Sequence, residues 1–151
     1  MDRKIERGGN MEKGTSDDDL GGAPGRCTPS EEIRLMHIAL AVCDVLRYAG
    51  MPAVYVGLLG AGASGAVVSH DPYSDDSAGV YVHWMSSPAL VQQVTRPEGP
   101  DPRAVALGSA ARQAMHPALR SILEAAGWKV TDHVDSASGT ERLKISAETA
   151  V

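Results

Sequence analysis

One helix with well-marked ends, Pro29 to Ala49, constrains the fold of this chain more than any other feature. Thr28 can cap the helix, Pro29 suits its first position, and Glu31 stands three residues after Thr28, which together form a capping box. Gly50 supplies the left-handed conformation that ends a helix, and Pro52 prevents its continuation. The chain must therefore provide a second layer that covers one side of this helix.

The side that needs covering is predicted from the spacing of apolar residues. An apolar stripe repeats at helical intervals: Ile33, Met36, Leu40, Cys43 and Leu46. The opposite stripe is polar: Arg34, His37, Asp44 and Arg47. We expect the first stripe to face the core and the second to face solvent.

Strands follow the helix. The predicted strands are Ala53–Leu59, Ala66–Ser69, Gly79–Met85, Trp128–Val134 and Arg142–Ser146. The predicted helices between them are a short one that runs from Ser87-Pro88 to Val94 and a long one, Pro102–Ala126. The fold class is therefore α+β, an antiparallel sheet with helices packed on it, in the order α-β-β-β-α-α-β-β. Type III secretion chaperones have a similar order of elements.

Two local features refine this prediction. Pro117 removes an amide and crowds the preceding turn, so we expect the long helix to kink or break at His116-Pro117. Trp84 and Trp128 are in phase with inward valines, which indicates that both tryptophans belong to the core.

The first 28 residues differ from the rest in composition. They contain six glycines and few large apolar side chains, and we therefore expect a disordered tail at 1–28 and one domain at 29–148. The net charge of −5 makes a nucleic-acid partner unlikely, and no apolar run is long enough to span a membrane. Cys27 and Cys43 are too few for a disulfide framework, which favours reduced thiols and a cytoplasmic location.

A glycine-rich segment invites a nucleotide-binding interpretation. Gly60 to Gly65 matches G-x-G-x-x-G after a predicted strand. The residues that follow favour a strand over a helix, and the segment around Val80, about 20 residues on, lacks the acidic ribose ligand of a dinucleotide site. We therefore expect a flexible loop between strands and predict no cofactor.

Histidines and aspartates gather on one predicted hairpin, as His70, Asp71, Asp75, Asp76 and His83. Imidazole and carboxylate groups are ligands for zinc and other first-row metals. Their spacing matches no known metal motif, so His70, Asp71 and His83 are weak candidates and a solvated turn is the alternative.

Two stretches resemble a group of small uncharacterised actinobacterial α+β proteins. One is Gly79-Val80-Tyr81-Val82-His83-Trp84, and the other is Leu119 to Gly127 followed by Trp128-Lys129-Val130. The resemblance covers about the last half of the chain and implies no function.

The alternation of side chains on the strands predicts an interaction face. If the valines and Trp84 face the core, one sheet face is left with Tyr55, Tyr81, His83 and Met85. Tyrosine and methionine are common in protein interfaces. We therefore expect a non-catalytic protein-interaction, regulatory or chaperone-like module that binds a protein partner or forms a homodimer. The alternative is a small-molecule or metal-binding protein, or an enzyme, that uses the His70–His83 hairpin.

The predicted tail is open to a direct test. Limited proteolysis is expected to remove residues 1 to about 27 and to leave a stable core, because the tail lacks apolar residues to bury. Mass spectrometry of the digest identifies the cleavage sites. A tail that resists protease in the native protein would contradict this prediction.

Overall fold

A computed structural model describes residues 25–57, 63–73 and 75–146. Its elements are α1 (Pro29–Tyr48), β1 (Ala53–Tyr55), β2 (Gly65–Asp71), β3 (Gly79–Met85), α2 (Pro88–Val94), α3 (Pro102–Ala125), β4 (Lys129–Val134) and β5 (Glu141–Ser146). This confirms the predicted order and the α+β class. The strands form one sheet in the spatial order β1-β2-β3-β5-β4.

The pairing of β1 with β2 departs from the expected antiparallel sheet. These two strands run parallel, and the other three pairs are antiparallel. The expectation was wrong because it inferred antiparallel pairing from short connections, whereas a strand of three residues spans only about 10 Å, a distance that a short connection can also retrace. Residues 60–62 of the glycine segment and residues 58–59 of the predicted strand Ala53–Leu59 lie outside the described residues.

Gly65 allows this parallel pair to form. It has a φ of +87°, and a Cβ at this position would lie 2.5 Å from the carbonyl oxygen of Pro52. Directly after it, the amide of Ala66 donates to that same carbonyl at 2.8 Å. The last glycine of the motif therefore brings two strands together, and a strand rather than a helix follows it, as predicted.

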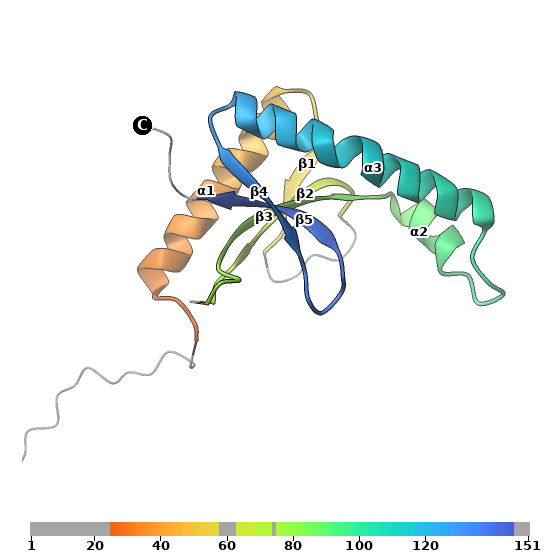
Figure 1. Ribbon diagram of the computed structural model, residues 1–151, viewed down its shortest axis with the longest axis horizontal. Coiled ribbons are helices and arrows are strands. Elements are labelled where there is room, and N and C mark those ends of the chain that lie inside the picture. The colour runs from red at the N-terminus through yellow and green to blue at the C-terminus, as the bar shows by residue number, and fades with distance from the viewer. Residues whose placement is uncertain (1–24, 58–62, 74, 147–151) are drawn as a thin grey trace, which may run out of the picture.

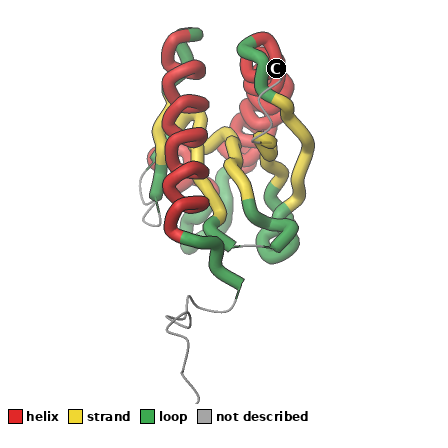
Figure 2. Tube along the Cα trace, turned by 90° about the vertical axis from the view of Figure 1, so that its left-hand side faces the viewer, coloured by secondary structure: helices red, strands yellow, loops and turns green. Residues whose placement is uncertain are grey.

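Helices α1 and α3 lie on one face of the sheet and meet at their C-terminal ends (Figure 1; Figure 2). α1 packs over β1, β2 and β3, while α3 packs over β3, β5 and β4. Trp84 and Trp128 both pack against the core, as predicted. The buried core residues are Leu35, Ala39, Val42, Cys43, Leu46, Ala66, Val68, Val80, Val82, Leu119, Leu123, Val130, Leu143 and Ile145.

The predicted core stripe of α1 was partly wrong. Cys43 and Leu46 are buried as expected, but Ile33 and Leu40 are exposed, and Leu35 and Ala39 take their places in the core. The helix has apolar residues on more than one stripe, so periodicity alone did not identify the one that faces the sheet. Burial raises the pKa of the Cys43 thiol, which keeps it protonated.

The predicted start of α1 is confirmed, and the ordered chain begins before it. Thr28 caps the helix, accepting a hydrogen bond from the amide of Glu31 at 3.3 Å. Of the predicted tail, residues 25–28 belong to the domain: Arg26 pairs with Tyr73 in a β-bridge, and the amide of Cys27 donates to the carbonyl of Pro72 at 2.7 Å. Residues 1–24 lie outside the described part.

Helix α3 is continuous from Pro102 to Ala125, so the predicted break at His116-Pro117 does not occur. Pro117 removes the amide that would bond to the carbonyl of Gln113. Both residues are exposed, so water can satisfy that carbonyl and the helix continues. Asp101 caps the start as expected, accepting from the amide of Arg103 at 2.8 Å. In the described ranges, none of the helices is both long and apolar enough to cross a membrane.

Replacing Pro117 with alanine tests this account of α3. The substitution restores a helical hydrogen bond at an exposed site, so we expect it to raise the free energy of unfolding by on the order of 1 kcal/mol. Urea denaturation measures the change. A clear loss of stability would show that α3 has a bend that its packing requires.

Candidate functional site

The strand register assigns each side chain to one of the two sheet faces. Tyr55 stands opposite Val68, Val68 opposite Val82, and Val82 opposite Leu143, so all four share the face that the helices cover. Tyr81, His83 and Met85 belong to the other face. Tyr55 was thus placed wrongly, because alternation fixes parity within one strand and leaves open which parity faces the core.

Tyr81 is not available to a partner protein. Its side chain is 1% exposed, and its hydroxyl donates to the carbonyl of Ser77. The Arg142 guanidinium lies 4.5 Å from the centre of its ring, and the His133 ring lies 4.9 Å away. Burial raises the pKa of the Tyr81 hydroxyl, which therefore stays neutral. Tyr81 stabilises the fold and does not belong to a docking surface.

The weak metal candidates do not converge. His70 stands opposite Val80 on the helix-covered face, where its Nδ1 lies 2.8 Å from the Tyr55 hydroxyl, whereas His83 stands opposite Val67 on the other face. Asp71 accepts a hydrogen bond from the amide of Tyr73 at 2.9 Å, as in an ordinary turn. Within the described residues, no group of three or more His, Cys, Asp or Glu side chains is arranged to hold a metal ion.

A cleft opens where the sheet splits. β3 and β5 are paired only as far as Val82 and Leu143. Beyond that point β3 continues to Met85 beside β2 alone, while β5 turns away with β4 toward the hairpin loop. The first half of α3 and the short helix α2 extend past the sheet at this end (Figure 1). The cleft lies between these helices, the end of β3 and the β4–β5 loop.

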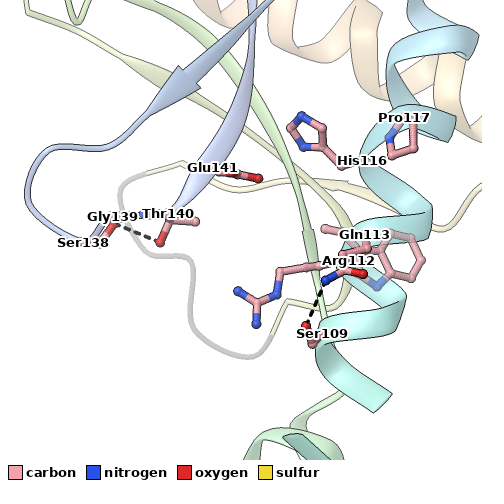
Figure 3. A pocket seen from close by; sticks show the side chains of 10 residues that line it. Ser109, Arg112, Gln113, His116, Pro117, Ser138, Gly139, Thr140 and Glu141 are labelled. Atoms are coloured by element: carbon pink, nitrogen blue, oxygen red, sulfur yellow. Dashed lines mark hydrogen bonds between the residues drawn. The ribbon is translucent and has the colours of Figure 1, made fainter. Parts of the chain in front are cut away.

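The cleft has a polar mouth and an apolar chamber. The mouth has a volume of about 540 Å³ and lies between α3 and the hairpin loop (Figure 3). The chamber has a volume of about 310 Å³ and lies against α2. Three residues line both cavities and join them: Trp84, Arg112 and Thr140. The apolar wall of the chamber consists mainly of Met85, Leu90, Val91, Val94 and Val105.

His83 and Met85 were singled out from the sequence, and both line this chamber. Nδ1 of His83 is buried and has no hydrogen-bond partner among the described residues. Burial lowers the pKa of His83, and nearby Arg142 lowers it further, so the imidazole stays neutral. The sequence analysis missed the helical side of the cleft, because valines and leucines at helical spacing look the same whether they line a cavity or fill a core.

A second surface lies on the outer side of α1. Three large apolar side chains are exposed there: Ile33 at 51%, Leu40 at 42% and Tyr48 at 98%. His37 and Asp44 lie between them on the same stripe of the helix, and both are exposed. We call these five residues the α1 stripe. Beside Tyr48, an open apolar groove separates the ends of α1 and α3, lined by Val45, Ala49, Ile122, Ala125 and Ala126.

No family model, curated protein or solved structure matches this chain.

Substitutions at Tyr81 separate a core role from a docking role. Tyr81→Phe removes the hydrogen bond to Ser77 and is expected to lower the free energy of unfolding by about 1 kcal/mol. Tyr81→Glu places a carboxylate at a buried site and is expected to lower it by more than about 3 kcal/mol. Urea denaturation measures both. A Tyr81→Glu protein with an unchanged free energy of unfolding would contradict this prediction and indicate that Tyr81 lies at the surface.

Proposed function

We propose that this protein is a cytoplasmic, non-catalytic interaction module of an adaptor, chaperone-like or regulatory kind, and that it forms a homodimer through the α1 stripe. The single observation that carries the proposal is the order of residues along that stripe. Ile33, Leu40 and Tyr48 are exposed apolar side chains on a helix that needs only its other side for the core. Apolar side chains gathered on a surface commonly mark a contact site.

The stripe is complementary to itself. Ile33 and Tyr48 are equally far along α1 from the midpoint between Leu40 and Ala41, and so are His37 and Asp44. A twofold axis at that midpoint would set the α1 helices of two copies antiparallel. Ile33 of one copy then meets Tyr48 of the other, His37 meets Asp44, and the two Leu40 side chains pack beside the axis. The Ile33–Tyr48 and His37–Asp44 contacts each occur twice, the contact between the two Leu40 side chains occurs once, and all of them pair groups of compatible chemistry.

Two alternatives, a docking face on the sheet and a metal site on the His70–His83 hairpin, have less support. The predicted face of the sheet is closed at Tyr81, and the weak metal candidates lie on opposite faces. An interface of one helix from each copy is small, so we expect a dimer in the micromolar range. The apolar groove beside Tyr48 extends the same surface and offers space for a further protein partner.

Leu40→Glu tests the dimer. It places two carboxylates beside the proposed axis, so the protein is expected to become monomeric, with its dimer dissociation constant raised more than about tenfold. Size exclusion with light scattering measures the mass at concentrations well above micromolar. Leu107→Glu is the matched control, because Leu107 is an exposed leucine of α3 outside the stripe and its substitution should leave the dimer intact. A wild-type protein that is monomeric throughout would refute the proposal.

The antiparallel register can be tested in the same assay. The His37→Glu substitution places a carboxylate opposite Asp44 of the second copy, and like-charge repulsion is expected to favour the monomer. Adding Asp44→Lys to that variant creates an opposite-charge pair and should restore the dimer. A double variant that stays monomeric while remaining folded would mean that these two positions do not meet.

A further inference from the structure

The apolar chamber of the cleft has the size and lining of a ligand pocket. Its volume of about 310 Å³ is at the lower end of the range for small-molecule sites. At about 30 Å³ for each water-sized group, it holds roughly ten heavy atoms. Gly108 lines the chamber, and a Cβ at this position would lie in van der Waals contact with the side chain of Leu90, at 3.5 Å.

Arg112 is the one charged side chain among the described residues that line the chamber. It projects from α3 at the junction of the chamber and the polar mouth (Figure 3). Within the described part of the chain, its guanidinium has no ion pair and no hydrogen bond. Arg142 does not line the chamber, and its guanidinium is paired with Asp135.

Two other titratable groups line the mouth, His116 and Glu141, and neither pairs with Arg112. Arg112 therefore determines the charge of the ligand that fits the cleft. His116 is held by Asp132, whose Oδ1 lies 3.0 Å from its Nε2. Glu141 lines the mouth on the side of the hairpin loop and makes no ion pair with Arg112. One guanidinium opposed by one carboxylate suits a single negative charge better than the double charge of a phosphate, and a carboxylate fits the guanidinium fork with two hydrogen bonds.

We propose that the cleft binds a small amphipathic carboxylate, with its apolar body in the chamber and its carboxylate on Arg112. The ligand is a molecule of about ten heavy atoms, such as a medium-chain fatty acid or an aryl-substituted acid. Ser109, Gln113 and Thr140 line the mouth around the carboxylate and offer further hydrogen-bond donors. This site goes beyond the proposed dimer. It lies at the α2 end of α3, whereas α1 packs at the opposite end (Figure 1).

A set of three probes with the same chain length tests the site: octanoate, octanamide and octylammonium. We expect octanoate to bind with a dissociation constant on the order of 1 mM or tighter, as its size allows. Octanamide is expected to bind about fivefold more weakly, because it lacks the charge that pairs with an exposed guanidinium, and octylammonium more weakly still. Titration followed by amide NMR shifts measures each constant and should locate the changes at Met85, Leu90 and Gly108.

Two arginine variants identify the group that binds the carboxylate. Arg112→Gln should weaken the binding of octanoate to the level of octanamide binding and leave the affinity for octanamide unchanged. Arg103→Gln is the matched control, because Arg103 is an exposed arginine of the same helix that does not line the cleft. Val91→Trp, at a half-exposed position of the chamber wall, should weaken octanoate and octanamide alike.

Several results would overturn the proposal. They are an octanoate affinity that Arg112→Gln leaves unchanged, octanamide binding as tight as octanoate binding, and shifts that map to α1 instead of the cleft. A lack of any shift up to about 10 mM octanoate would overturn it as well, since that limit is ten times the expected constant. The Leu40→Glu variant separates the two proposals, because octanoate binding should persist in a protein whose dimer is lost.

Discussion

The packing of small apolar side chains of β2 and β3 against α1 and α3 supports the rest of the structure. Ala66, Val68, Val80 and Val82 are all fully buried or nearly so, and they meet Leu46 and Leu119 from the two helices. Because these strand residues are short, both helices can approach the sheet closely. Burial of apolar surface stabilises a fold by roughly 25 cal/mol for each square ångström, so this layer contributes to the driving force for folding.

Both candidate surfaces are consequences of that packing. α1 packs over β1, β2 and β3, and its outer stripe is left exposed because no other element of the described residues covers it. α3 is longer than the part of the sheet it covers, so its first half extends past the split between β3 and β5 and packs on α2. The same central strands that fix the core therefore also fix where the cleft opens.

The second face of the sheet shows how polar groups can close a surface. Tyr81 is buried beneath the side chains of β4 and β5, with Arg142 over its ring and His133 beside it. Arg142 is in turn held by Asp135 at the start of the β4–β5 loop. Nε of Arg142 and Nδ1 of His83 are both buried without a hydrogen-bond partner among the described residues, so this face carries polar groups close to the cleft.

The pKa of His83 is lower in the folded protein than in the unfolded chain, because burial disfavours the charged imidazole. As the pH falls below the pKa that His83 has in the unfolded chain, the unfolded chain takes up the proton first. The contribution of His83 to the free energy of unfolding is therefore lost as the pH falls.

The sequence by itself determined the order of elements, the ends of the helices and the burial of Cys43, because caps, prolines and side-chain spacing act within a few residues of one another. It could not decide which apolar stripe of α1 faces the sheet, on which face Tyr55 lies, or that β1 runs parallel to β2, because each depends on a neighbour distant in the chain. His83 and Met85 were identified as functional candidates, but Arg112 and the valines of α2 and α3 were not. Their common site exists only because β3 and β5 separate beneath α3, and that separation arises from the tertiary packing of the sheet.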